Sequence, residues 1–376
     1  MYERPVASVG TKPLAIHNGS NWNERWIRYC RERSIPHKVV NCFDSDVLDQ
    51  IKECGGLMWM LRLDRPQDML VGRHVLNAAK LMGLKVFPDF PESWHYDDKL
   101  AQKYLFEALG LPTPRAWAFF EETRALQFIE RCDLPVVAKL RHGASSSNVR
   151  LLRTRREGRS YVRRMFGRGI SPVPAPWANA KQRIKVALAV SGISRTATGL
   201  KGAPSEYKVA LPVGGVNQML IRLKRAPRVY LETVCARRNA VRERGYLYLQ
   251  EFIPGNTCDY RLMIVGNKCW GYRRMVRAGD FRASGSHFQD PDHTKITDTM
   301  IQTAFASAER LGMRSVGIDF VMDHDRPLIV EISCCYGIDE WEYEGFWDRN
   351  LHWHEERVDP RDQIVEEMVR ELKKAL

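Results

Sequence analysis

Two carboxylates near the end of the chain are well suited to hold a metal ion. Asp319 and Glu331 lie in a segment that reads as two apolar strands joined by a turn. A turn from Asp323 to Pro327 sets Asp319 directly opposite Glu331, and Ser333 shares their face because side chains alternate along a strand. Opposed carboxylates destabilise a sheet unless a cation lies between them, and Mg²⁺ prefers hard oxygen ligands. We predict a magnesium site at Asp319, Glu331 and Ser333; a register displaced by one residue would instead turn one acid toward solvent.

A lysine inside an apolar strand is the second chemical feature. Lys139 interrupts the expected strand Leu134 to Leu140, and the small polar loop Gly143 to Asn148 follows it. Such a lysine can neutralise phosphate oxygens while the backbone N–H groups of the loop cradle them. The loop alone would be typical of an ordinary turn. The lysine and the loop together predict a phosphate-binding site.

Arginines gather around a second expected hairpin. A two-residue turn at Gly266-Asn267 sets Asp259 opposite Arg274, and Arg277 and Arg282 follow soon after. Arginines near a metal-binding hairpin suit two-point recognition of phosphate or carboxylate. A cross-strand ion pair explains Asp259 and Arg274 equally well, but it does not account for Arg277 and Arg282.

The elements that must position these residues follow a mixed α/β pattern. Short apolar runs alternate with helical stretches from Leu14 to Pro88, and a helix is expected to open at Asp97-Asp98-Lys99. A strand is expected at Tyr246 to Ile253, and an amphipathic helix at Arg361 to Ala375. The segment from about 155 to 230 has little periodicity and is interpreted as an insertion of unknown structure.

Charge is distributed unevenly along the chain. The protein carries a net charge of +13, yet residues 150–244 hold 22 Lys and Arg against four acids. A basic segment inside a mildly acidic remainder indicates an anionic partner, although a solvated basic surface is the alternative.

Length and composition set the class of protein. A chain of 376 residues is expected to form two or three lobes. It shows neither an N-terminal signal-peptide pattern nor an apolar run long enough to span a membrane. Nine cysteines without a repeated spacing favour reduced thiols in the cytoplasm.

Several motifs together resemble the ATP-grasp superfamily in order and spacing. They are Lys99 after two aspartates, Lys139 before the Gly/Ser loop, Gln250-Glu251-Phe252-Ile253, Asp259-x-Arg261, Gly279-Asp280-Phe281-Arg282, and Asp319 with Glu331. Among characterised branches, the motifs resemble those of the RimK-like amino-acid ligases. The blocks 280–286 and 347–355 also resemble ATP-grasp proteins of bacterial surface-polysaccharide gene clusters. The resemblance covers roughly residues 95–150 and 246–355.

The resemblance implies roles for individual residues. ATP would be bound by Lys99, Lys139, Ser145, Ser146, Ser147, Gln250, Glu251, Phe252, Ile253 and Asp259; Mg²⁺ by Asp319, Glu331 and Ser333; and the phosphorylated intermediate would be stabilised by Arg282, with Arg274 and Arg277 nearby. The related ligases have asparagine where this chain has Ser284 and Ser333, which places a two-metal arrangement in doubt.

The expected fold class is therefore α/β (α+β), an ATP-grasp fold with three parts. These are an N-terminal α/β domain (1–92), a central subdomain that includes the basic insertion (93–245), and a C-terminal subdomain with the metal site (246–376).

The expected activity is ATP- and Mg²⁺-dependent ligation of an anionic carboxylate substrate to an amine acceptor. A kinase acting on an anionic small molecule is the first alternative. The second is a non-catalytic, ATP-responsive protein that binds nucleic acid, which the sparse aromatic residues of the basic segment disfavour. A homodimer is left open.

Overall fold

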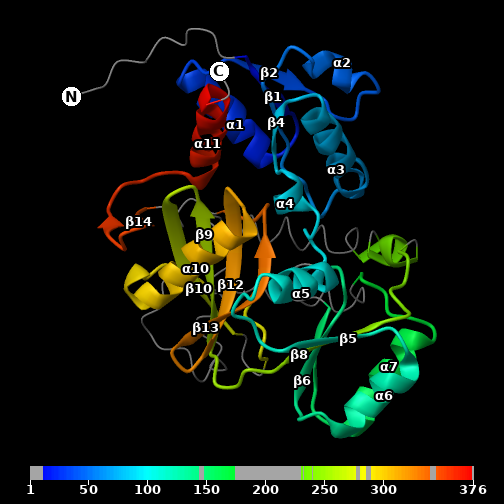
Figure 1. Ribbon diagram of the computed structural model, residues 1–376. Helices are drawn as coiled ribbons and strands as arrows, with labels where there is room; N and C mark the ends of the chain where they lie inside the picture. Colours follow the sequence, from blue (N-terminus) through cyan, green and yellow to red (C-terminus); the bar gives the residue numbers. More distant parts are fainter. Residues whose placement is uncertain are drawn as a thin grey trace.

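The computed structural model describes residues 12–143, 148–173, 230–231, 233–238, 240–276, 280–284, 289–338 and 344–374. Within these ranges the chain forms three β-sheets, each accompanied by helices (Figure 1). We name them the N-terminal sheet, the central sheet and the large sheet.

The N-terminal sheet is parallel and has the strand order β2-β1-β3-β4. Its strands are β1 (Leu14–His17), β2 (His37–Val40), β3 (Gly56–Met58) and β4 (Lys85–Phe87). The helices of this lobe are α1 (Asn21–Glu32), α2 (Val47–Ile51), α3 (Pro66–Leu81) and α4 (Phe90–Ser93). Strands β1 and β3 are buried throughout, as expected where helices cover a parallel sheet. The small α/β unit predicted from the sequence is confirmed.

The last helix, α11 (Pro360–Lys374), returns to this lobe and packs against α1 (Figure 1). Arg25 on α1 donates from Nε to Oδ1 of Asp362 at 2.6 Å. The first and last elements of the described chain therefore both belong to the N-terminal lobe.

The central sheet has the order β5-β8-β6-β7 and is antiparallel. Its strands are β5 (Ala116–Phe119), β6 (Val136–Lys139), β7 (Val149–Leu152) and β8 (Leu247–Glu251). Helices α6 (Glu122–Arg131) and α7 (Arg155–Phe166) pack against each other beside it, and α5 (Lys99–Ala108) precedes it. The segment from about 155 to 230 was interpreted as an insertion of unknown structure, and its first twelve residues form the regular helix α7. Its buried residues, among them Tyr161, Val162 and Met165, lie on one face, but frequent arginines mask that periodicity.

The large sheet has the order β13-β12-β9-β10-β14-β15, with β11 paired to β10. Its strands are β9 (Cys258–Val265), β10 (Lys268–Met275), β11 (Gln289–Asp290), β12 (Ser315–Asp323), β13 (Arg326–Ser333), β14 (Phe346–Asp348) and β15 (Trp353–His354). The short helix η2 (His293–Lys295) leads into α10 (Asp298–Leu311), which packs on the sheet and ends at Gly312 with a positive φ of 65°. A left-handed residue after a helix is a favoured stop signal for which glycine has no steric cost.

The predicted turn of the β12–β13 hairpin is wrong, although the predicted pairing of its acids is right. Asp323 pairs with Arg326, so only two residues form the turn, and His324 has a positive φ of 56°. Further along, Asp319 pairs with Glu331 while Phe320 pairs with Ile329. Val330 is thus the extra residue of a β-bulge, which restores the register that a five-residue turn would have given. In the other hairpin, the predicted pairing of Asp259 with Arg274 across Gly266-Asn267 is confirmed.

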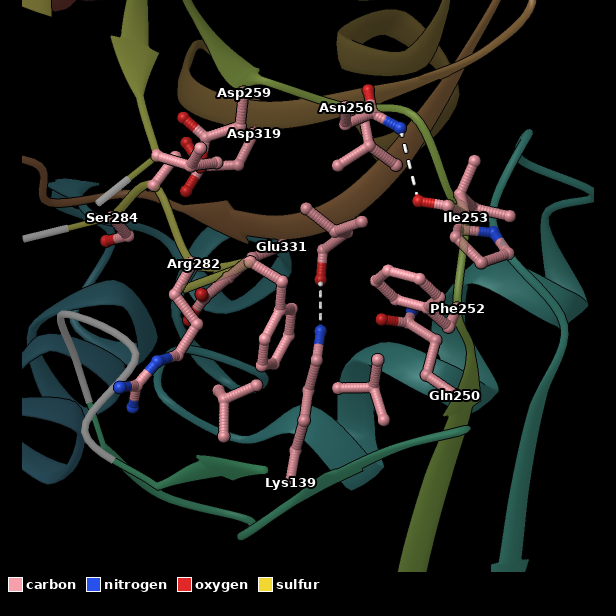
Figure 2. Close-up of a pocket in the computed structure, with 18 of the residues that line it drawn as sticks. Lys139, Gln250, Phe252, Ile253, Asn256, Asp259, Arg282, Ser284, Asp319 and Glu331 are labelled. Atoms are coloured by element: carbon pink, nitrogen blue, oxygen red, sulfur yellow. Dashed lines mark hydrogen bonds between the residues drawn. The ribbon is translucent and has the colours of Figure 1, made fainter. Parts of the chain in front are cut away.

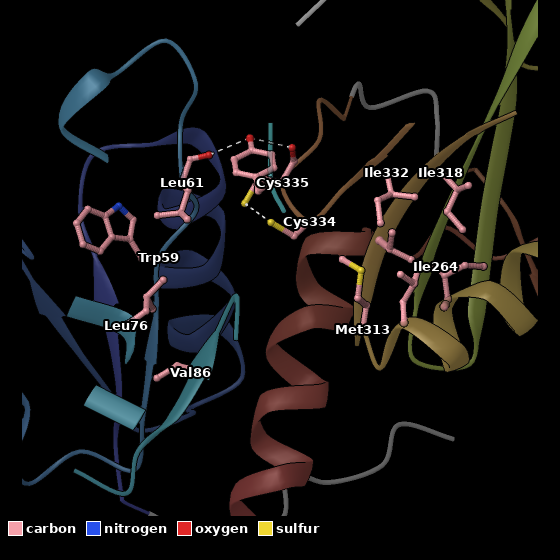
Figure 3. Packing of buried hydrophobic residues seen from close by; sticks show 14 of the residues in the cluster. Trp59, Leu61, Leu76, Val86, Ile264, Met313, Ile318, Ile332, Cys334 and Cys335 are labelled. Atoms are coloured by element: carbon pink, nitrogen blue, oxygen red, sulfur yellow. Dashed lines mark hydrogen bonds between the residues drawn. The ribbon is translucent and has the colours of Figure 1, made fainter. Parts of the chain in front are cut away.

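One hydrophobic core joins the N-terminal lobe to the large sheet. Figure 3 shows Trp59, Leu61, Leu76 and Val86 on one side, Ile264, Met313, Ile318 and Ile332 on the other, and Cys334 and Cys335 between them. The Tyr96 hydroxyl bonds to the carbonyl oxygens of Leu61 (3.2 Å) and Cys335 (3.3 Å), so polar contacts reinforce the junction. Because this core buries apolar side chains of β12 and β13, it holds in place the hairpin that carries Asp319 and Glu331.

Two predictions from composition can be compared with the described residues. None of the helices found there is long and apolar enough to cross a membrane. All nine cysteines are free thiols in the structure.

Candidate functional site

A pocket lies between the central sheet and the large sheet and contains about 900 Å³ of empty space, part of it open to solvent. In Figure 2, Lys139 rises from β6 toward the β12–β13 hairpin, with Asp259 and Asp319 at one end and Gln250, Phe252 and Ile253 at the other. The walls also contain apolar side chains, namely Val137, Val149, Val321 and Val330. Residues that are far apart in the sequence therefore meet in one cavity.

Lys139 is the last residue of β6 and is 8% exposed. Its Nζ lies 3.5 Å from the carbonyl oxygen of Val330, the bulged residue of β13. A bulge takes a residue out of the regular ladder, which leaves this carbonyl oriented toward the lysine. Burial lowers the pKa of Lys139 to about 8, against the opposing attraction of Glu331. The lysine is therefore charged at neutral pH without a carboxylate in direct contact among the described residues.

Lys99 is the first residue of α5, which Asp98 caps by accepting the Ala101 N–H. Its Nζ donates to the Gly143 carbonyl oxygen at 2.9 Å and lies 3.3 Å from Oε1 of Glu331. Gly143 begins the Gly/Ser loop, so Lys99 links the start of this loop to Glu331, one of the two predicted metal ligands.

The segment that leads into the loop is held by Glu243. Its two carboxylate oxygens accept the N–H groups of Arg141 (2.9 Å) and His142 (3.2 Å). Tyr246 adds a hydroxyl that accepts the same Arg141 N–H and donates to Glu243. Burial alone would raise the pKa of Glu243, but hydrogen bonds from His142 and Tyr246 hold that pKa below its usual value. Since Asp97 also accepts the Gly143 N–H at 2.9 Å, acidic groups fix three successive N–H groups.

Asp319 is surrounded by arginines. Arg261 donates from Nε to Oδ1 (2.7 Å) and from Nη2 to Oδ2 (2.9 Å), and Arg274 adds a contact from Nη2 to Oδ2 at 2.7 Å. Arg274 also binds Asp259 through two hydrogen bonds, of 2.6 and 2.8 Å. Burial would raise the pKa of Asp319, but the two guanidinium groups hold it far below its usual range. The cations that relieve the repulsion between Asp319 and Glu331 are therefore side chains of the protein itself.

The carboxylates still fit a magnesium ion. A carboxylate offers about four lone-pair sites, and the arginines use three of those on Asp319. One site on Oδ1 stays available, and among the described residues Glu331 forms an ion pair with Lys99 alone. Ser333 is placed differently, because its hydroxyl donates to the Cys335 carbonyl oxygen at 2.6 Å and it does not line the pocket. Of the three predicted ligands, Asp319 and Glu331 therefore line the pocket and Ser333 does not.

The segment after β8 forms the other end of the pocket. Gln250, Glu251, Phe252 and Ile253 all line the cavity. The Glu251 side chain also pairs with Arg115 at 3.1 Å. Asn256 fixes this segment, since its Nδ2 donates to the carbonyl oxygens of Ile253 (3.3 Å) and Met322 (2.9 Å). Its Oδ1 accepts the Met322 N–H at 2.8 Å, so a single amide joins this segment to β12.

Arg282 and Ser284 close the remaining side of the pocket (Figure 2). Arg282 pairs with Asp280 at 2.7 Å, and Phe281 packs edge-on against Phe252 with ring centroids 5.9 Å apart. Four predicted site residues, Ser145, Ser146, Ser147 and Arg277, lie outside the described residues.

Sequence reasoning did not find Glu243 and Asn256, and it did not find the partner of Arg261. Glu243, Asn256 and the pairing of Arg261 with Asp319 all act across long separations in the chain. The alternation of β9 offers one usable signal, because Arg261 is two residues from Asp259 and must share its face. Glu243 and Asn256 stand in segments without periodicity, so their partners follow only from the folded chain.

The fold and the site define the class: this is an ATP-grasp fold. A crystal structure of a RimK domain ATP-grasp protein from Sphaerobacter thermophilus aligns over 94% of this chain and 98% of that one, with a TM-score of 0.51 and 14% identity. Within this fold, residues 215–346 match the model of the RimK-like ATP-grasp domain.

Two curated relatives are similar over part of the chain. A probable alpha-L-glutamate ligase of Cellvibrio japonicus is 30% identical over 27% of this chain and 34% of its own length. A ribosomal protein bS6–L-glutamate ligase of Salmonella paratyphi B is 27% identical over 31% of this chain and 40% of its own length. The similarity therefore spans well under half of either relative.

Proposed function

We propose that this protein is a ligase that uses ATP to activate a carboxylate as an acyl phosphate, which an amine then attacks. The observation that carries the proposal is the meeting of Lys139, Lys99 and the Asp319–Glu331 pair in one pocket. Two lysines suit an anionic polyphosphate, and the opposed carboxylates suit its metal ion. The names of the curated relatives, which are glutamate ligases, support the same type of reaction.

The nucleotide would lie along the length of the pocket. Its base would occupy the end formed by Phe252, Ile253 and the valine side chains, where backbone groups beyond β8 can provide hydrogen bonds. Its phosphates would reach Lys139, Lys99 and the loop that begins at Gly143. Catalysis of phosphoryl transfer depends mainly on such positioning and on electrostatic stabilisation.

The metal ion would be held by Glu331 and by the remaining lone pair of Asp319 Oδ1. When bound, Mg²⁺ would neutralise charge on the phosphates and align them for in-line attack. Arg261 and Arg274 keep Asp319 ionised and fixed in place, so this ligand is ready before the nucleotide arrives.

The reaction has two steps. A carboxylate oxygen of the substrate attacks the γ-phosphorus of ATP, the bond to the β-phosphate oxygen breaks, and ADP leaves. The nitrogen of the amine then attacks the acyl carbon, phosphate leaves with the bonding electrons, and the amine loses a proton. Arg282, at the pocket wall, would stabilise the negative charge that develops on the transferred group.

The substrates belong to the same proposal. A carboxylate that bears further negative charge fits the basic residues around the pocket. A primary amine would be the acceptor, in modification of a peptide or of a surface polysaccharide. Such an ATP-consuming reaction suits the cytoplasm.

The test measures ADP release with candidate carboxylates, with and without an amine, together with hydroxamate formation when hydroxylamine replaces the amine. We expect ADP release to require a carboxylate, and hydroxamate to form from it. Glu331→Gln should abolish both signals, whereas Glu130→Gln, on the exposed face of α6, should leave them unchanged. ADP release with a hydroxyl substrate and no hydroxamate would indicate a kinase and overturn the proposal.

A further inference from the structure

A second groove adjoins the first pocket on the side of β7 and α7. It is lined by residues 149–154 and by Arg156, Glu157, Ser160, Tyr161, Arg164, Asp280, Phe281 and Arg282. Val149, Phe281 and Arg282 also line the first pocket, so the two hollows share a wall. A molecule in the groove can therefore extend one end toward the proposed site of phosphoryl transfer.

The groove is strongly basic. Its lining contains five arginines, at positions 150, 153, 156, 164 and 282, but only two acids, Glu157 and Asp280. Asp280 is paired with Arg282, and Glu157 accepts the backbone N–H of Arg153. Within the part of the chain that the structure describes, no carboxylate forms a salt bridge with the side chains at positions 150, 153, 156 and 164.

Two of these arginines share one face of α7. Arg156, Ser160 and Arg164 recur every four residues along α7 and so lie above one another on the helix. Burial and the charges of Arg168, Arg150, Arg242 and Arg237 lower the pKa of Arg164, which indicates repulsion that the described residues leave unrelieved. The basic field thus continues past the groove, toward a neighbouring hollow lined by positions 234, 237, 238, 240 and 242.

The charge balance favours a multivalent anion. The lining residues carry a net charge of +3, and a single carboxylate would neutralise only part of it. A phosphate monoester carries roughly two negative charges, and arginine binds phosphate oxygens in two-point contacts. The hydroxyl groups of Ser160 and Thr154 add donors of the kind that phosphate accepts.

The residue types that line the groove disfavour binding of nucleic acid. Only Tyr161 and Phe281 are aromatic among the lining residues, and Tyr161 is 5% exposed. A binding surface for single-stranded nucleic acid needs exposed aromatic rings on which successive bases stack.

We propose that this groove binds the phosphate or diphosphate group of a small substrate whose other end reaches Arg282 at the shared wall. The inference rests on the proposed function in one respect, namely that the end of the substrate that reaches Arg282 is a carboxylate. Binding of the phosphate group itself requires only the arginines of β7 and α7.

The test uses inorganic pyrophosphate as the probe and isothermal titration calorimetry as the readout. The full chain is first saturated with ADP without added magnesium, so that the nucleotide pocket is filled. We expect saturable binding of one pyrophosphate per chain. Replacing two exposed arginines of the groove (R153E/R156E) should weaken this binding by roughly tenfold or more, since each removed contact is a charged hydrogen bond.

The matched control reverses two exposed lysines of the N-terminal lobe, Lys52 and Lys85 (K52E/K85E), and should bind pyrophosphate like the wild type. The dissociation constant for ADP should be the same in all three proteins. Equal pyrophosphate affinity in R153E/R156E, or displacement of ADP by pyrophosphate, would overturn the inference. Tighter binding of a hexaglutamate peptide than of pyrophosphate would overturn it as well, in favour of an acidic chain. Because no turnover is measured, a negative hydroxamate assay together with the expected binding would refute the proposed function alone.

Discussion

Arg261 holds Asp319 through two parallel hydrogen bonds, Nε to Oδ1 at 2.7 Å and Nη2 to Oδ2 at 2.9 Å. The two residues face each other on neighbouring strands β9 and β12, and both side chains are largely buried. Buried charges are tolerated only while their partners stay in place. Arg261 therefore has a structural role, fixing the carboxylate proposed to hold the metal ion.

Replacing Arg261 by leucine should destabilise the fold. Asp319 would keep only Arg274, which already binds Asp259, so a buried negative charge would lose most of its compensation. We expect the free energy of unfolding to fall by about 3 kcal/mol. Urea denaturation followed by circular dichroism measures this change. The exposed pair Arg124–Glu121 provides the control, because Arg124→Leu should cost at most about 1 kcal/mol. Equal effects of the two substitutions would show that the Arg261–Asp319 pair contributes little.

The pKa of Lys139 should govern nucleotide binding above neutral pH. Burial lowers this pKa to about 8, so the free protein loses the lysine charge as pH rises through that value. Polyphosphate prefers the charged lysine, and the affinity for ATP should therefore fall between about pH 7 and 9. Fluorescence anisotropy with a labelled ATP analogue measures the affinity at each pH.

Lys139→Arg is the matched variant, because arginine stays charged throughout this range. Its affinity profile should be flat between pH 7 and 9, even if the absolute affinity is lower. Stability should show the opposite trend in the wild type. The unfolded lysine, with a pKa of about 10.4, binds more protons than the folded one between pH 8 and 10, so unfolding becomes less favourable as pH rises there. A wild-type affinity that does not change with pH would exclude Lys139 from contact with the phosphates.

Glu243 should act on nucleotide binding by shaping the loop segment. Glu243→Gln places an amide group where one carboxylate oxygen now accepts an N–H of Arg141 or His142. We expect KM for ATP to rise roughly tenfold, because a less well-fixed loop segment should weaken ATP binding by about 1.4 kcal/mol. The value of kcat at saturating ATP should change much less. Tyr246→Phe, which removes the second acceptor for the Arg141 N–H, should shift KM in the same direction. A fall in kcat with KM unchanged would contradict a positioning role.

Much of the architecture was accessible from the sequence because it depends on local patterns. Alternating apolar residues fixed the β9–β10 hairpin, and a short turn at Gly266-Asn267 set its register correctly. The predicted pairing in the β12–β13 hairpin is correct because two deviations from the prediction cancel. The turn is shorter than predicted, and the bulge at Val330 restores the pairing of Asp319 with Glu331. A bulge leaves no clear mark in the residue types, so this register could not have been derived by counting alone.

The site was less accessible, because its charges are balanced across segments that are distant in sequence. The sequence located both acids and both lysines, but it assigned the relief of repulsion at Asp319 to a metal ion. In the folded chain Arg261 and Arg274 already supply positive charge there. Helix α7 was hidden for a different reason. It carries many arginines, and its exposed face dilutes the apolar periodicity on which the sequence interpretation relied.

Asn256 should link the stability of the fold to nucleotide binding. Its amide bonds to both backbone groups of Met322 and to the Ile253 carbonyl oxygen, so it holds the proposed base-binding segment against β12. Asn256→Ala should lower the free energy of unfolding by about 2 kcal/mol, because partly buried backbone groups lose their partners. It should also raise KM for ATP. Asn256→Asp separates the two contacts, since a carboxylate still accepts the Met322 N–H but repels the two carbonyl oxygens, and it should be at least as harmful as alanine. Asn41, whose side chain donates to Asp44 at the surface of the N-terminal lobe, is the control, and Asn41→Ala should leave both quantities within error of the wild type. If Asn256→Ala changed stability but left KM unchanged, the segment after β8 would not be the part of the pocket that contacts the base.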